Sequence, residues 1–251
     1  MSGHSKWSTI KRKKGKADAE RGKIFTKLIK EIVVAAREGG GAPDSNPRLR
    51  TAVQAARDAN MPVANVDKAI ARGTGELPGV VYESATFEGY ALGGVAVLVE
   101  SLTDNRNRTT AEVRHIFSKH GGHLGEPGSV AYMFENKGLV VIDQASAEEE
   151  KVYEIALENG AEDIRTESDQ FEIVCPPEAF EGIREGIVSA GIEYQVAEVS
   201  LHPTTTVGLD SDQAIKVLKL VSALEDNEDV QRVSANFDIT DEILGQIEDQ
   251  I

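Results

Sequence analysis

The sequence predicts an α+β chain of three domains: an N-terminal three-helix bundle and two ferredoxin-like α/β domains, one inserted in the other. Three observations predict this fold. Residues 17–73 carry apolar side chains at helical spacing. Strand and helix patterns then alternate regularly over residues 138–201. One further helix and one further strand follow, which is too little for a domain of their own.

The helical bundle is predicted from three short apolar stripes. Residues 17–38 repeat apolar side chains every three or four positions, and a run of three glycines ends this helix. Pro47 opens a second helix, and Met61-Pro62 separates it from a third that closes at Gly73. Because the connections are short, the helices should pack as a small bundle. We assign residues 1–75 to this bundle and to the arm that precedes it.

The two α/β domains are predicted from the order of the elements. Residues 138–201 follow the order β-α-β-β-α-β, a complete ferredoxin-like unit. The elements expected around it are strands at 81–89, 92–102 and 130–135, a helix at 106–120, a helix at 210–225 and a strand at 230–237. These should form a middle domain from residues 76–136 and 205–251, with residues 137–204 inserted. We expect the acidic end, 241–251, to fray.

Charge is distributed very unevenly along the chain. Residues 1–75 hold 16 Lys and Arg against 7 Asp and Glu, a net charge of +9. The remaining residues hold 11 against 35, a net charge of −24, and the whole chain carries −15. A protein this acidic would be repelled by nucleic acid unless its positive charge were concentrated in one region. The sequence concentrates it at the N-terminus.

The N-terminal arm is the first candidate binding site. Its cations are separated by small and polar residues that cannot bury a core, and each phosphate contact would release counterions. The candidate phosphate contacts in the arm and first helix are Lys6, Lys11, Arg12, Lys13, Lys14, Lys16, Arg21, Lys23, Lys27 and Lys30. Trp7, the only tryptophan, would stack on an unpaired base, and Arg48, Arg50 and Arg72 would extend the surface. The alternative is a basic tail that is simply solvated.

A second candidate site lies at the start of the helix expected at 106–120. Arg106 and Arg108 fall in its first turn, where the helix dipole disfavours cations. An unfavourable placement beside free backbone N–H groups indicates an anion site, to which Arg114 would contribute from the next turns. The alternative is that Asp104 or Asn105 caps the helix and that the arginines point into water.

Other kinds of site find little support. His115, His120 and His123 do not share one helical face, so we predict no metal site. The glycine-rich segment 121–128 follows a helix rather than a strand and lacks the G-K-[ST] ending of a phosphate loop; we expect a mobile contact loop. No nucleophile stands in a recognisable catalytic setting. We therefore predict no enzyme and no cofactor, and, without an apolar signal segment, a cytoplasmic protein with no membrane partner.

Three stretches resemble the YebC family. They are GHSKW with the basic segment after it, the segment from Asn46-Pro47 through NMP, and TDNRNRTTAEVRHIFSKHGGHLGEPGSVAYMF at 103–134. The resemblance runs from Ser2 to about Asp238 and implies a helical bundle and two ferredoxin-like domains, one inserted in the other. It also implies a DNA-binding transcriptional regulator, as the family is usually described. Some members resemble translational activators or ribosome-associated factors.

The residues and the resemblance together predict a non-enzymatic, nucleic-acid-binding regulator of gene expression. The expected partner is DNA, or in the alternative rRNA or tRNA on the ribosome. We find no helix with a set of Arg, Asn and Gln for reading base edges and no helix-turn-helix. Backbone binding with weak sequence preference fits RNA as well as duplex DNA. A competing class is a protein-interaction module whose arm docks on an acidic protein.

Overall fold

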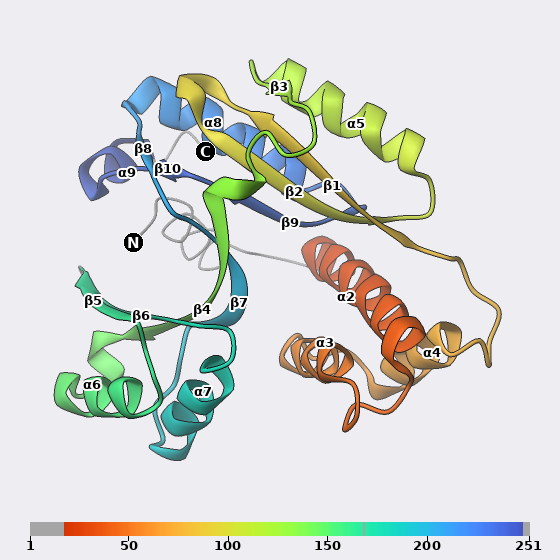
Figure 1. Cartoon of the computed structure of the whole chain (residues 1–251), viewed down its shortest axis with the longest axis horizontal. Coiled ribbons are helices and arrows are strands. Elements are labelled where there is room, and N and C mark those ends of the chain that lie inside the picture. Colours follow the sequence, from red (N-terminus) through yellow and green to blue (C-terminus); the bar gives the residue numbers. More distant parts are fainter. Residues whose placement is uncertain (1–17, 168, 248–251) are drawn as a thin grey trace. The chain divides into compact units, whose positions relative to one another are not determined.

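The structure is a computed structural model of the 251-residue chain, and it describes residues 18–167 and 169–247 (Figure 1). It is an α+β protein in which the described residues divide into two compact units. The first unit comprises residues 18–129 and 212–233, and the second comprises residues 130–211 and 234–247.

The first unit begins with the helical bundle. Its helices are α2 (Asp18–Gly39), α3 (Pro47–Asp58) and α4 (Val63–Gly73), close to the predicted bounds. Asn46 caps α3, where its side chain accepts a hydrogen bond from the backbone N–H of Leu49 at 3.0 Å. The core is aliphatic, and Ile32, Leu49 and Ala56 in it are fully buried. The predicted bundle is therefore present.

The same unit contains a four-stranded sheet in the order β3-β1-β2-β9. The strands are β1 (Glu83–Tyr90), β2 (Ala96–Thr103), β3 (His123–Leu124) and β9 (Val230–Ala235), and the helices are α5 (Arg106–Lys119) and α8 (Ser211–Glu225). β1 and β2 form an antiparallel hairpin across the 3-10 turn η1 (Leu92–Gly94), in which Gly93 and Gly94 take positive φ values of 75° and 78°.

One predicted strand of this sheet was wrong. Residues 130–135 are not a strand of their own: η2 (Ala131–Met133) is a 3-10 turn, and β4 (Phe134–Asp143) belongs to the second sheet. The edge strand is instead the two-residue β3, which lies in the predicted loop 121–128 and pairs with Gly89 and Tyr90 of β1. Apolar residues at 130, 133 and 134 suggested a strand without fixing its partner.

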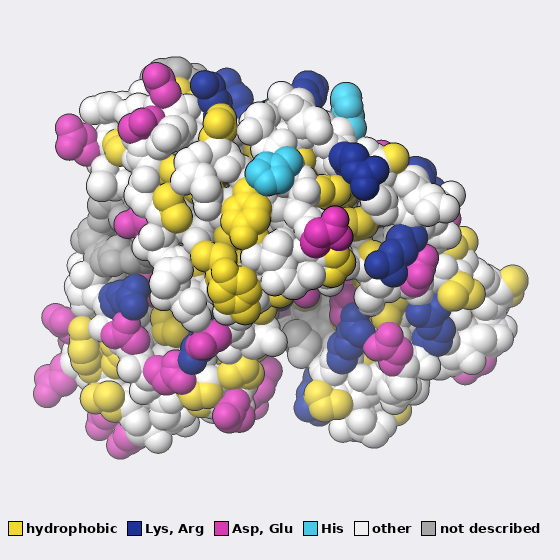
Figure 2. All heavy atoms as spheres, turned by 45° about the horizontal axis from the view of Figure 1, so that its top comes forward, with side chains coloured by type: hydrophobic (Ala, Val, Ile, Leu, Met, Phe, Trp, Pro, Cys, Tyr) yellow, Lys and Arg dark blue, Asp and Glu magenta, His cyan; other side chains and the backbone are white. Residues whose placement is uncertain are grey.

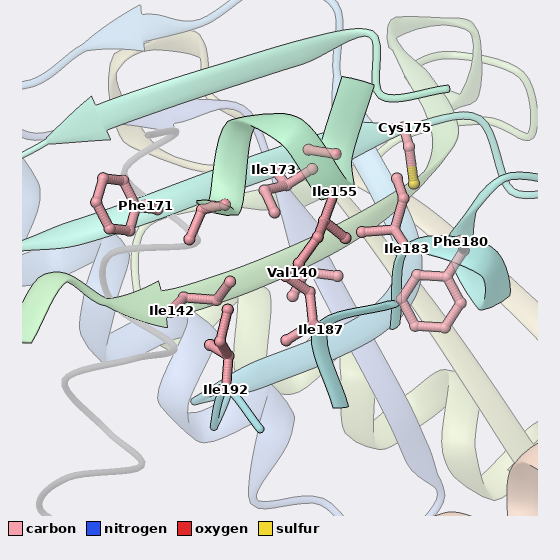
Figure 3. Close-up of a cluster of buried hydrophobic side chains, with 12 residues drawn as sticks. Val140, Ile142, Ile155, Phe171, Ile173, Cys175, Phe180, Ile183, Ile187 and Ile192 are labelled. Atoms are coloured by element: carbon pink, nitrogen blue, oxygen red, sulfur yellow. The ribbon is translucent and has the colours of Figure 1, made fainter. Parts of the chain in front are cut away.

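The second unit is built on a sheet in the order β5-β6-β4-β7, with antiparallel neighbours throughout. Its further elements are η3 (Gln144–Ser146), α6 (Glu149–Glu158), β5 (Asp163–Glu167), β6 (Gln170–Cys175), α7 (Phe180–Ser189) and β7 (Val196–Pro203). This is the predicted ferredoxin-like arrangement. Figure 3 shows its core, in which Ile142, Ile173 and Ile187 from two strands and a helix are fully buried.

The C-terminal residues of the second unit form a small separate pairing. β8 (Val207–Gly208) pairs in parallel with β10 (Phe237–Asp238), and α9 (Asp241–Ile247) follows. The expectation that residues 241–251 fray was therefore wrong for 241–247, because Leu244 and Ile247 are buried. The strands of the second sheet interrupt the first sheet in sequence, between β3 and β9. The predicted domain boundaries themselves stay a prediction.

Candidate nucleic-acid interface

The cations of the arm cannot be placed. Lys6, Trp7, Lys11, Arg12, Lys13, Lys14 and Lys16 lie outside the described residues. Their assignment as nucleic-acid contacts stays a prediction from the sequence. The structure places the remaining candidates on four helices of the first unit: α2, α3, α4 and α5.

The cations of α2 reach toward the end of α8. Arg21 and Lys23 are exposed, and Lys23 forms an exposed ion pair with Asp226 at 3.1 Å. Lys27 donates to the backbone carbonyl of Glu225 at 2.6 Å. An exposed pair of this kind contributes little to stability, so a phosphate can displace Asp226 from Lys23 at small cost.

Lys30 differs from the other cations of α2 because it is buried. Its Nζ lies 2.6 Å from Oδ1 of Asp229, with the two side chains only 8% and 6% exposed, and it also donates to the carbonyl of Glu228 at 2.9 Å. The same ammonium lies 5.5 Å from the ring centre of Tyr82. The sequence predicted a phosphate contact, whereas this structure shows the charge satisfied internally.

Asp229 is the centre of this polar cluster. Its Oδ2 accepts hydrogen bonds from Arg108 and from the buried hydroxyl of Thr109, both at 2.7 Å. The hydroxyl of Thr103 lies 2.7 Å from that of Thr109. Burial alone would raise the pKa of Asp229, but the hydrogen bonds from Arg108, Lys30 and Thr109 outweigh it and hold that pKa well below its usual range. The carboxylate therefore stays ionised although it is buried.

At the start of α5 the predicted cap is present, whereas Arg108 is bound by carboxylates of the same unit, which neither alternative predicted. Asn105 caps the helix and accepts from the backbone N–H of Arg108 at 3.1 Å. The Arg108 guanidinium binds Asp229 and Asp104, which raise its pKa above the usual value. Arg106 and Arg114 are exposed, and within residues 18–167 and 169–247 neither has a carboxylate partner. Arg108 therefore has a structural role, whereas Arg106 and Arg114 remain exposed.

The arginines of α3 and α4 also differ in whether carboxylates of the same unit bind them. Arg48 pairs with Glu31 at 2.7 Å and with Glu38 at 2.6 Å, and its hydrogen bond to Glu31 is the main reason why its pKa is raised. Among the described residues, the guanidinium of Arg50 makes only a long contact of 3.4 Å to the carbonyl of Asp44. Arg72 is exposed. Arg50 and Arg72 are therefore better placed than Arg48 to bind an external anion.

Several exposed cations of the first unit were not singled out from the sequence. Arg57 on α3 and Lys68 on α4 are exposed, as are Lys119 on α5 and Lys216 and Lys219 on α8. No ion pair joins any of these five to a carboxylate within the described part of the chain. The sequence could have indicated these cations by their position on the polar side of helices whose apolar stripes are clear. It was weak because these cations are spread along the sequence.

The histidines and the glycine-rich loop do not form a binding site of the kinds considered. Among the described residues, no three His, Cys, Asp or Glu side chains are grouped as a metal site requires. The loop is tethered rather than free: the backbone N–H of Gly128 donates to the buried Glu88 at 2.6 Å, and Tyr90 donates to the carbonyl of Ser129 at 2.9 Å. His123 stacks against Tyr90, with ring centres 5.8 Å apart.

The fold defines a class of protein: a helical bundle with exposed cations, followed by two α/β sheets of which one interrupts the other in sequence. The profile described as "TACO1/YebC protein N-terminal domain" matches residues 5–76, and that described as "TACO1/YebC second and third domain" matches residues 82–237. The chain belongs to the TACO1/YebC family.

Relatives match along the whole chain. One from Desulfosudis oleivorans is 54% identical over 97% of this chain and 99% of its own length. Another, from Syntrophobacter fumaroxidans, is 55% identical over 98% of this chain and 100% of its own length. Both carry the name "Probable transcriptional regulatory protein". The crystal structure of a conserved hypothetical protein from Aquifex aeolicus is 49% identical, with a TM-score of 0.81 over 91% of this chain and 95% of that one.

In the part of the chain that the structure describes, no helix is both long and apolar enough to span a bilayer.

Proposed function

We propose that this protein is a non-enzymatic regulator of gene expression that binds the phosphate backbone of nucleic acid. The observation that carries the proposal is the charge distribution, +9 over residues 1–75 in a chain of net charge −15. A cationic segment in an acidic protein directs binding, because the rest of the surface repels polyanions. The name that the curated relatives share supports a regulatory role.

The contacts that we assign to this function are the cations of the arm, predicted from the sequence, and exposed cations on the helices of the first unit. They are the arm cations at positions 6–16 together with Arg21, Lys23, Arg50, Arg72, Arg106 and Arg114. Lys30, Arg48 and Arg108 are left out, because each is held by carboxylates of the same unit. Removing Lys30 or Arg108, which hold the buried carboxylate of Asp229, would weaken the fold first and binding only indirectly.

The first experiment changes the arm without shortening it. Lys6, Lys11, Arg12, Lys13, Lys14 and Lys16 are replaced by Gln in the full chain, and binding to labelled RNA and DNA duplexes is measured by fluorescence anisotropy between 50 and 200 mM salt. Six lost phosphate contacts should flatten the slope of log affinity against log salt by about five. A control with Lys151, exposed on α6, replaced by Gln should keep the slope. Unchanged affinity at both salt concentrations would overturn the proposal.

Two further measurements separate the related functions. Co-sedimentation with ribosomes through a sucrose gradient would favour a translation factor, whereas binding confined to DNA would favour a transcription factor. A protein-interaction module would bind an acidic protein through the arm, would lose it to a polyanion competitor such as heparin, and would not bind bare nucleic acid. The exposed cations of the bundle and of α5 carry no base-reading set, which is the reason for testing RNA and DNA together.

A further inference from the structure

A second cationic surface lies on the first unit, away from the arm in the sequence. It is formed by α5 with its C-terminal cap and by the exposed stripe of α8. Its members, which we call the α5–α8 face, are Arg114, His115, Lys119, His120, Lys216 and Lys219. In Figure 2, dark blue and cyan side chains gather over the part of the surface that α5 occupies in Figure 1.

The two helices are neighbours in this unit. Asn227, just beyond α8, donates a hydrogen bond to Glu112 of α5 at 2.8 Å. At the other end of α5, His120 lies near Lys219 of α8. The pKa of His120 is lowered, first by partial burial and then by the positive charges of Lys119 and Lys219. His120 therefore lies in a positive environment shared by both helices.

The carboxylates near this face do not neutralise it. Glu112 is engaged by Asn227 and lies 4.0 Å from Arg108. Asp226, at the end of the α8 stripe, pairs with Lys23. Within the described residues Arg114, Lys119 and Lys219 have no ion pair. Residues 76–251 carry a net charge of −24, so unpaired cations gathered on one face indicate an anionic partner.

The width of the α5–α8 face distinguishes between DNA and RNA duplexes as partners. Each helix is about 10–12 Å across with its side chains, so two helices side by side are wider than the B-DNA major groove of about 12 Å. Such a face cannot read base edges there and can only follow the backbone. An RNA duplex presents a wide, shallow minor groove lined with 2′-hydroxyls, which proteins recognise by shape and by phosphate and ribose contacts. His115 and the exposed Ser118 supply groups that hydrogen-bond to hydroxyls.

We infer that the α5–α8 face binds the backbone of double-stranded RNA, with Lys119 and Lys219 on phosphates and His115 on a ribose hydroxyl. This inference rests on the proposed function and names the partner and a second anchor for it. The arm and this face would act as two linked contacts on one RNA, each raising the effective concentration of the other.

The test compares five full-length proteins: the unchanged chain, Lys119→Ala/Lys219→Ala, His115→Ala, the arm variant described above, and Lys151→Ala as a control for loss of an exposed lysine. Binding is measured by anisotropy with a 20-base-pair RNA duplex and a DNA duplex of the same sequence, over a series of salt concentrations. Both altered lysines are exposed, so folding should be preserved, and circular dichroism checks this. We expect at least a tenfold loss of affinity for RNA and a salt slope lower by about two in the double variant but not in Lys151→Ala.

The outcomes separate the inference from the function on which it rests. If the double variant binds RNA as the unchanged chain does, while the arm variant has lost binding, the α5–α8 face is not a contact and the proposed function stands. If the unchanged chain binds neither duplex, both proposals fail. Equal loss of affinity for RNA and DNA would overturn the assignment to RNA. Loss confined to RNA, together with reduced binding to RNA by His115→Ala but not by Lys151→Ala, would support the inference in full.

Discussion

The ammonium of Lys30 lies 2.6 Å from the carboxylate of Asp229, and both side chains are buried. The pair joins α2 of the helical bundle to the residue that precedes β9 in the sheet of the same unit. Arg108 and Thr109 bring the start of α5 to the same carboxylate. One acidic side chain thus ties together three elements that lie far apart in sequence.

Replacing Asp229 by Asn should destabilise the protein strongly. The change leaves Lys30 buried without a counter-ion, and breaking one side of a buried pair costs about 3–5 kcal/mol. Urea unfolding followed by far-UV circular dichroism measures the loss. The matched control is Asp226→Asn, which removes an exposed pair with Lys23 and should change stability by less than about 1 kcal/mol. Equal effects of the two substitutions would show that the cluster does not hold the unit together.

The same carboxylate should make stability depend on acid. The folded state holds the pKa of Asp229 below its usual value, because hydrogen bonds to the ionised form outweigh the effect of burial. Its contribution is therefore complete above the unfolded pKa, about 3.9, and is lost as pH falls toward the folded pKa. The stability gap between the unchanged chain and Asp229→Asn should be widest near pH 7, should begin to narrow below about pH 5 and should go on narrowing as the pH falls toward the folded pKa. A gap independent of pH would contradict this assignment.

The hydroxyl of Thr109 should contribute strongly to the stability of the folded protein. It is fully buried and donates to Asp229 at 2.7 Å. Thr109→Val keeps the shape but removes the donor, and hydrogen bonds to charged groups contribute about 1.5–3 kcal/mol. Thr51→Val on α3 is the control, since the Thr51 hydroxyl is exposed and only bonds to the carbonyl of Pro47. Chemical denaturation should give Thr109→Val a clearly lower free energy of unfolding than Thr51→Val.

Local patterns were enough to predict most helices and the second sheet. Asn46 followed by Pro47 marks the start of α3 by capping and by a fixed φ, both of which act over a few residues. The strand β6 belongs to the β-α-β-β-α-β order predicted over residues 138–201, because alternating apolar residues and flanking turns define a short strand. These features depend on neighbours in sequence, so the sequence is sufficient to predict them.

Features set by distant partners could not be predicted in this way. The edge strand β3 has two residues and exists only because β1 offers it hydrogen bonds, so no periodicity reveals it. Lys30 continues the basic series of α2, and only a residue 199 positions later makes it a buried partner rather than a surface charge. Charge counts along a chain cannot separate exposed cations from those that the fold neutralises.

A pair of glycine substitutions tests the packing of the bundle. A Cβ on Gly73 would lie 2.5 Å from the carbonyl oxygen of Val33 and 2.7 Å from the Cβ of Ala36, whereas one on Gly22 would meet nothing within 4 Å. Gly73→Ala should therefore force α4 away from α2, at about 1–3 kcal/mol. Gly22→Ala, in α2, should be neutral or stabilise the helix by up to about 1 kcal/mol. The thermal midpoint should fall in Gly73→Ala and should stay the same or rise in Gly22→Ala. A Gly73→Ala variant as stable as the unchanged chain would show that α2 and α4 approach less closely.

The single thiol should report on the second unit. Cys175 is buried in the core beneath α7 (Figure 3), and burial raises its pKa to about 11. Because the thiolate is the reactive form, the native protein should react with Ellman's reagent at pH 8 only as fast as this core opens. Added urea should speed the reaction in step with unfolding of the second unit. Rapid labelling of the native chain would mean that the Cys175 core is open to solvent.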